Sequence, residues 1–168
     1  MVTRTRRSFP EHIRLVVFDF DGVMTDNRVW VNDRGEEWVA CNRSDGLGLE
    51  MLRRIGLELL VLSTERNGVV AARCRKLGLP FEQGLVDKAD RLATLLRERG
   101  IEASEVVYVG NDVNDLSCMR LVGCAVAVAD AHRDARRAAD VVLTRAGGHG
   151  AVRELCDRLA AHVSRRRS

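Results

Sequence analysis

The sequence predicts an α/β fold in which a parallel sheet is covered by helices on both faces. Short runs rich in Val, Leu and Ile alternate along the chain with longer amphipathic stretches, as expected when helices connect neighbouring parallel strands. Several of these stretches are followed by glycine, which favours a left-handed helix end. Polar residues come directly after the apolar runs, at the edge where open α/β sheets bind their ligands.

The individual elements follow from this alternation. The expected strands are Arg14–Asp19, Glu58–Leu62, Val106–Val109, Ala125–Val128 and Val141–Leu143. The expected helices are Asp45–Ile55, Gly68–Leu77, Lys88–Arg99, Asp115–Val122, Arg133–Ala138 and Ala151–His162. The glycines expected to end helices are Gly56, Gly78, Gly100 and Gly123.

One insertion, residues 28–40, interrupts the alternation. Two β-like arms flank a turn-forming segment at residues 32–35, and Trp30 and Trp38 can pair across the resulting hairpin. Because an isolated two-stranded hairpin is marginally stable in water, it should pack on something else. The sequence leaves open whether that partner is the hairpin's own domain or another subunit.

Length and composition indicate one domain with a complete hydrophobic core. The chain has 168 residues, of which 46% are hydrophobic and 30% charged, as is usual for globular proteins. We expect a single domain over residues 13–163, between a flexible basic N-terminal tail, 1–12, and a basic C-terminal tail, 164–168.

A net charge of +3 and an aromatic content of 4% argue against nucleic-acid binding. Since the sequence shows neither a bilayer-spanning apolar run nor an apolar leader, we expect a cytoplasmic protein without membrane association.

Two aspartates end the first expected strand. Asp19 and Asp21 are two residues apart, so on a strand both side chains point to the same face. Their like charges repel unless a cation or a shared proton lies between them. Mg²⁺ prefers such oxygen ligands and acts together with phosphate groups. The alternative is that both aspartates are solvated turn residues.

Three further polar clusters follow later in the chain. Ser63 and Thr64 come after the second expected strand, where a hydroxyl can hydrogen-bond a phosphate oxygen or simply cap the next helix. Lys88 opens a helix and can neutralise phosphate, although a lysine is more often a solvated surface charge. Asn111 and Asp112 follow the third expected strand and add oxygen ligands to the same edge of the sheet.

In this order the four clusters resemble the four motifs of the haloacid dehalogenase superfamily. The resemblance implies a Rossmann-like sheet, with Asp19 as the nucleophile and Asp21 as the general acid and base. It implies that Gly22, Ser63 and Lys88 hold the phosphoryl group. Mg²⁺ would be bound by Asp19, the Asp21 backbone carbonyl and a side chain of the fourth motif.

Within the superfamily the chain resembles the 3-deoxy-D-manno-octulosonate 8-phosphate phosphatase family. The shared features are Asp19-x-Asp-Gly-Val-x-Thr-Asp26, the Trp-containing hairpin and Gly147-Gly-His-Gly-Ala-Val-Arg-Glu154. The gaps between the motifs leave no room for a cap domain. The resemblance implies a phosphorylated 2-keto-3-deoxy sugar acid as substrate. It also implies a homotetramer in which the hairpin or the chain end of one subunit reaches a neighbour's site.

The fourth motif departs from the family pattern. The family has a metal-binding aspartate where this chain has Asn111. An amide oxygen can still bind Mg²⁺ but brings no charge, so either Asn111 or Asp112 is the expected ligand. This departure supports an alternative function, a catalytically weak assembly subunit associated with a CMP-sugar-acid synthetase.

The expected substrate-binding segments also depart from the octulosonate enzymes. The residues concerned are Ser44 and Asp45 in one segment and Thr64, Glu65 and Arg66 in the other. Both segments are closer to relatives that act on nine-carbon, sialic-acid-type 9-phosphates. The expected activity is therefore hydrolysis of octulosonate 8-phosphate or of a nonulosonate 9-phosphate.

Overall fold

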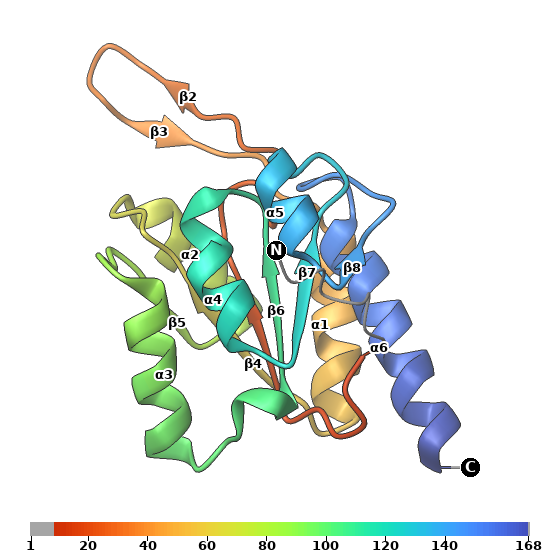
Figure 1. The fold of residues 1–168 in the computed structure, drawn as a ribbon. Helices are drawn as coiled ribbons and strands as arrows, with labels where there is room; N and C mark the ends of the chain where they lie inside the picture. The colour runs from red at the N-terminus through yellow and green to blue at the C-terminus, as the bar shows by residue number, and fades with distance from the viewer. Residues whose placement is uncertain (1–8, 168) are drawn as a thin grey trace.

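The computed structural model describes residues 9–167 and has a parallel sheet at its centre (Figure 1). The strands of this sheet are β1 (Leu15–Phe18), β4 (Glu58–Leu62), β5 (Phe81–Glu82), β6 (Val106–Gly110), β7 (Cys124–Ala127) and β8 (Val141–Val142). They lie in the order β5-β4-β1-β6-β7-β8, and every neighbouring pair is parallel. The predicted α/β fold is confirmed, and no element within residues 9–167 forms a separate cap domain.

Helices cover both faces of this sheet. They are α1 (Ser44–Arg54), α2 (Gly68–Leu77), α3 (Lys88–Arg99), α4 (Leu116–Leu121), α5 (Arg133–Ala138) and α6 (Ala151–Arg167), with 3₁₀ turns η1 (Ala103–Glu105) and η2 (Val113–Asp115). Helix α1 packs against α6, and α4 contacts both α3 and α5. Right-handed crossovers place α1 and α2 on one face and α3, α4 and α5 on the other, because the chain changes direction across the sheet after β5.

Two local details differ from the sequence prediction. Strand β5 has only two residues, too few to produce a periodic signal, and it forms because it pairs with the end of β4. Gly56, Gly78 and Gly100 have positive φ as expected, but Gly123 does not. A side chain at Gly123 would instead overlap the Ser104 backbone, so close packing explains this glycine.

Both chain ends are more ordered than expected within the described residues. Residues 1–8 of the predicted N-terminal tail lie outside those residues, whereas Phe9 packs edge-on against the His162 ring, at 5.7 Å between centroids. The His162 ring also contacts the Pro10 carbonyl at 3.0 Å. Helix α6 continues to Arg167, so residues 164–167 extend the helix and the expectation of a tail there was wrong. An ion pair of 3.0 Å between Arg166 and Glu11 joins the two ends.

The hairpin projects away from the sheet (Figure 1). Its strands β2 (Trp30–Val31) and β3 (Glu37–Trp38) are antiparallel, and Trp30 pairs with Trp38 as predicted. Both indoles remain solvent-exposed, Trp30 by 68% and Trp38 by 52%. The Trp-bearing face is therefore not covered by the hairpin's own domain within residues 9–167.

Among residues 9–167, none of the helices has both the length and the apolar character that a membrane span needs.

Candidate active site

The site begins where the buried strand β1 ends. The backbone N–H of Asp19 donates to the Val109 carbonyl on β6 at 2.9 Å, which extends the sheet by one residue and leaves the Asp19 carboxylate at its edge. Asp19 is buried. The chain then turns at Gly22, where φ is +79°, and a methyl group there would also overlap the Asn111 amide. Glycine is therefore required, because it allows the first and fourth motifs to lie in contact.

A buried threonine holds this turn together. The Thr25 hydroxyl oxygen accepts hydrogen bonds from the backbone N–H groups of Gly22, at 3.1 Å, and Asn27, at 3.2 Å. The same hydroxyl lies 3.4 Å from Asp21 Oδ1, to which it donates. Thr25 thereby fixes the position of the second aspartate.

Lys88 is placed in the site by the start of helix α3. Asp87 caps this helix by accepting from the N–H groups of Ala89 and Asp90, so Lys88 is its first residue. The side chain is only 3% exposed, and its Nζ lies 3.1 Å from Asp19 Oδ1 and 2.5 Å from Asp115 Oδ1. Burial opposes the charged form of Lys88, but Asp19 and Asp115 outweigh that effect and raise its pKa. The alternative of a solvated surface lysine was wrong.

Asp115 is the residue of the candidate site that the sequence analysis missed. Its carboxylate is completely buried and accepts a hydrogen bond from the Tyr108 hydroxyl at 2.6 Å, in addition to the Lys88 contact. Its other oxygen accepts from the backbone N–H groups of Asn111, at 2.8 Å, and Asp112, at 3.2 Å. Asp115 therefore joins the third motif to the fourth. The available signal was an aspartate beginning an expected helix, which normally indicates only a cap.

The site holds more negative than positive charge. Burial and the nearby Asp115 raise the pKa of Asp19 to about 7, although Lys88 opposes the shift. Burial and the charges of Glu65 and Glu37 also raise the pKa of Asp21. Raised carboxyl pKa values mean that the ionised forms lack sufficient counter-charge. A cation beside these groups would stabilise the ionised forms.

The predicted residues from three of the four motifs line one cavity. This cavity has a volume of about 270 Å³ and is lined by Asp19, Asp21, Ser63, Thr64, Asn111 and Asp112, among others. Lys88 is buried behind Asp19 and does not line it. A second hollow, of about 310 Å³, shares Asp21 and Thr64 with the first and is lined also by Glu65. The four separate stretches of sequence are thus brought together at the carboxyl edge of the sheet.

Three predicted substrate-binding residues do not line either cavity. Ser44 Oγ donates to the Asn42 side chain at 2.7 Å, and Arg66 is exposed on the loop after β4. Asp45 is buried and accepts from the N–H of Arg153 at 3.2 Å, so it joins the start of α1 to α6. Burial raises the pKa of Asp45 to about 6.

The residues present fit a magnesium ion. No group of three or more His, Cys, Asp or Glu side chains within residues 9–167 is arranged to hold a metal, so neutral oxygens would have to complete the coordination. Asp19 and Asn111 both line the cavity, and Mg²⁺ is commonly held by one or two carboxylates with water and phosphate oxygens. Asp112 uses one carboxylate oxygen to accept from the N–H of Val113 at 2.7 Å. The Asn111 amide, in contrast, lies directly against Gly22 of the first motif, and this position beside Asp19 and Asp21 favours Asn111 as the side-chain ligand from the fourth motif.

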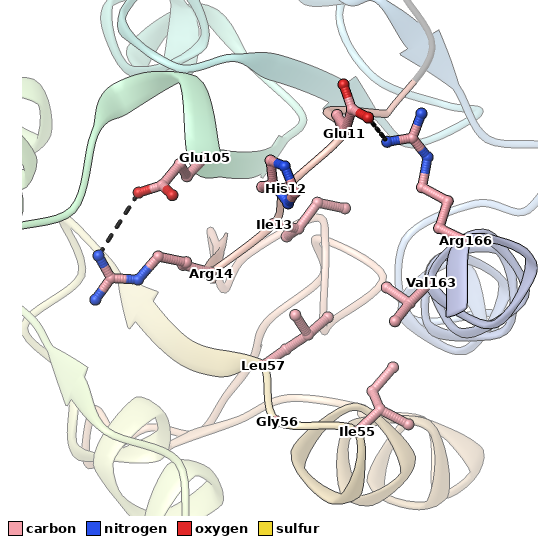
Figure 2. A pocket seen from close by; sticks show the side chains of 10 residues that line it. All are labelled: Glu11, His12, Ile13, Arg14, Ile55, Gly56, Leu57, Glu105, Val163 and Arg166. Atoms are coloured by element: carbon pink, nitrogen blue, oxygen red, sulfur yellow. Dashed lines mark ion pairs between the residues drawn. The ribbon is translucent and has the colours of Figure 1, made fainter. Parts of the chain in front are cut away.

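A larger hollow of about 690 Å³ lies elsewhere, near the entry to β1 (Figure 2). Apolar side chains of Ile13, Leu57 and Val163 face it. Its charged groups are already paired, Arg14 with Glu105 at 3.6 Å and Arg166 with Glu11 at 3.0 Å. None of the predicted catalytic residues lines it, so its size does not make it the active site.

Comparisons with known proteins agree with this geometry. A family model described as haloacid dehalogenase-like hydrolase matches residues 81–155. The 3-deoxy-D-manno-octulosonate 8-phosphate phosphatase KdsC of Escherichia coli (strain K12) is 39% identical over 150 residues, covering 89% of this chain and 80% of that protein.

Solved structures show the same similarity. A putative HAD family hydrolase from Streptomyces avermitilis is 49% identical, with a TM-score of 0.87 and coverage of 92% of this chain and 89% of that one. The 3-deoxy-D-manno-octulosonate 8-phosphate phosphatase from Moraxella catarrhalis, in complex with a magnesium ion, a phosphate ion and KDO, is 34% identical. Its TM-score is 0.87, with coverage of 90% and 88%. From its fold, its site and these similarities, the chain belongs to the KdsC-like phosphatase family of the haloacid dehalogenase-like hydrolases and is a phosphomonoester hydrolase.

Proposed function

We propose that this protein hydrolyses the terminal phosphomonoester of a 2-keto-3-deoxy sugar acid through an aspartyl-phosphate on Asp19. The observation that carries the proposal is the contact of Lys88 with Asp19 beside a cavity that contains Asp21, Ser63 and Asn111. This arrangement supplies a nucleophile, a second carboxyl group, a hydroxyl donor and a buried positive charge at one point. The substrate is octulosonate 8-phosphate or a nonulosonate 9-phosphate.

The residues of the chain have distinct roles in this reaction. Asp115 holds Lys88, and Lys88 in turn holds the Asp19 carboxylate in place, so that one oxygen attacks the phosphorus atom in line with the departing sugar oxygen. Asp21 donates a proton to that oxygen and then takes one from the water that cleaves the aspartyl-phosphate. Its raised pKa favours the protonated form needed in the first step. The Ser63 hydroxyl oxygen accepts from the Glu65 N–H at 3.0 Å, which orients the hydroxyl for donation to a phosphate oxygen.

Magnesium is the cofactor of this family member, and it supplies positive charge that reduces repulsion between the carboxylates and the phosphate dianion. Asp19, the Asp21 carbonyl and the Asn111 side chain are the groups that would hold it. Because Asn111 is neutral, the ligands of this chain carry less negative charge than they would with an aspartate at position 111.

Phosphate release from candidate substrates tests the proposal. The purified protein should release phosphate from eight- or nine-carbon 2-keto-3-deoxy sugar acid phosphates when Mg²⁺ is present and not after chelation. Asp19→Asn should lose turnover by at least about 10³-fold, since it removes the nucleophile, while its circular dichroism spectrum should match the wild type. If the protein binds Mg²⁺ but hydrolyses neither substrate class, the better interpretation is a catalytically weak assembly subunit associated with a CMP-sugar-acid synthetase.

The exposed hairpin supports a homotetramer. A two-stranded hairpin with exposed Trp30, Val31 and Trp38 is marginal in water, and burial between subunits would stabilise it. Sedimentation at micromolar concentration should show a tetramer, and Trp30→Arg should shift the protein towards smaller species. A wild-type monomer under these conditions would refute the assembly.

A further inference from the structure

The hollow beside the catalytic cavity adjoins the place where the phosphate ester would lie in the proposed reaction. It shares Asp21 and Thr64 with the catalytic cavity, and Asp21 is the group that protonates the departing oxygen. One wall comes from the loop after β4, with Glu65, and the other from the hairpin, with Glu37. In the proposed reaction the carbons next to the phosphate ester would lie between these two walls.

Strand pairing determines which hairpin side chains face this hollow. Val31 pairs with Glu37, and Trp30 pairs with Trp38. Since side chains alternate between the two faces of a strand, Glu37 lies on the face opposite the two indoles. Val39, two residues further along, lines the same hollow as Glu37, as this alternation requires. The hairpin thus presents the two indoles outward, whereas Glu37 lines the hollow together with the apolar side chains of Val29 and Val39.

The charges of the hollow restrict what can bind there. Glu37, Glu65 and Asp21 line it with carboxyl groups, whereas Arg28 is its cationic residue. Glu65 is held rigidly, because Oε1 accepts from the N–H groups of Arg66, at 2.6 Å, and Asn67, at 2.8 Å. Ionised carboxylates are hydrogen-bond acceptors without donors. They suit hydroxyl groups and repel a second carboxylate.

We propose that Glu37, opposite Glu65, is a specificity-determining residue that accepts hydrogen bonds from the hydroxyl groups next to the phosphate-bearing carbon of the substrate. The proposal rests on the proposed function and extends it. The acid group of the sugar lies beyond the hollow, away from both glutamates. Polyhydroxylated chains between the phosphate and the acid are accepted, and short acid phosphates are rejected by charge repulsion.

Glu37→Gln tests this role, with Glu36→Gln as the matched control. Both substitutions remove one negative charge from the same hairpin, but Glu36 is exposed and accepts from Asn32 within the turn at 2.7 Å. Kinetics are measured on the sugar acid phosphate, on p-nitrophenyl phosphate, which has no hydroxyls, and on 3-phosphoglycerate, whose acid group lies close to its phosphate.

Glu37→Gln should raise KM for the sugar acid phosphate about tenfold, which corresponds to one charge-assisted hydrogen bond, with kcat within about threefold of the wild type. Its kcat/KM on p-nitrophenyl phosphate should change by less than about threefold, because removing the Glu37 charge also acts on Asp21, and it should rise on 3-phosphoglycerate, while Glu36→Gln should match the wild type throughout. An unchanged KM for the sugar acid phosphate, or an equal loss on p-nitrophenyl phosphate, would overturn the role of Glu37. Failure of the wild type on all sugar acid phosphates would refute the proposed function itself, and the role of Glu37 with it.

Discussion

The two edges of the central sheet carry hollows of opposite character. The hollow near the entry to β1 is the larger, at about 690 Å³, and its charged side chains form ion pairs such as Arg14 with Glu105 (Figure 2). The catalytic cavity at the carboxyl edge is smaller, at about 270 Å³. There the buried carboxylates of Asp19 and Asp115 share Lys88 as their buried cation.

This difference shows that unbalanced buried charge, and not volume, distinguishes the active site. Exposed ion pairs contribute little because water screens them. A buried carboxylate without full compensation costs stability and is retained where chemistry needs it. Substitutions at the two edges should therefore have effects of very different size.

After the loss of the nucleophile in Asp19→Asn, the largest effect is expected from Asp115→Asn. The substitution removes the charge that holds Lys88 and should lower kcat about 100-fold, the equivalent of about 3 kcal/mol for a hydrogen bond to a charged group. Tyr108→Phe removes one hydrogen bond to the same carboxylate and should cost about tenfold. Steady-state kinetics measure kcat for both variants, and thermal unfolding checks that each variant is folded. Full activity in Asp115→Asn would show that Lys88 needs no partner besides Asp19.

Asn111→Asp should increase metal affinity. The added charge at the expected ligand should tighten Mg²⁺ binding by about 1–3 kcal/mol, measured by isothermal titration calorimetry. Activity at limiting Mg²⁺ should rise in parallel. If Asp112 is the ligand instead, Asn111→Asp should leave the affinity unchanged and Asp112→Asn should abolish binding.

Asp45→Asn should stabilise the protein at neutral pH. The folded-state pKa of Asp45 is raised to about 6 by burial, so its ionised form is unfavourable above that pH and the penalty disappears as the pH falls towards 4. The neutral amide, which can still accept from Arg153, should raise the unfolding free energy by about 1 kcal/mol at pH 7.5. The gain should vanish near pH 4. A large loss of turnover without a change in stability would instead place Asp45 in contact with substrate, as the family resemblance implied.

The smallest effect is expected at the opposite hollow. Glu11→Gln breaks the exposed pair with Arg166 and should change the unfolding free energy by less than about 0.5 kcal/mol. Chemical denaturation and the phosphatase assay should both match the wild type. A loss of activity here would show that the two edges of the sheet are coupled.

The sequence predicted most of the helices and strands, because each depends on local periodicity. Helices α2, α3 and α5 have the predicted bounds, and the Trp30–Trp38 pairing follows from a short turn signal. Strand β5 escaped prediction because two residues carry no period, and helix α6 continues beyond its predicted end to Arg167, near which Arg166 pairs with Glu11. Contacts between distant segments of the chain have no local signature.

The candidate site shows the same difference between features with a local sequence signal and features that depend on distant contacts. The sequence by itself determined the residue types at the strand ends, Asp19, Asp21, Ser63 and Asn111, because strand alternation and parallel topology bring such positions to one edge. Only the tertiary structure decided that Asp115 joins Lys88 to the fourth motif, since that carboxylate acts across 27 residues of sequence. It likewise decided that Glu37 faces inward, because the direction in which a hairpin lies over the domain depends on packing and not on the turn that forms it.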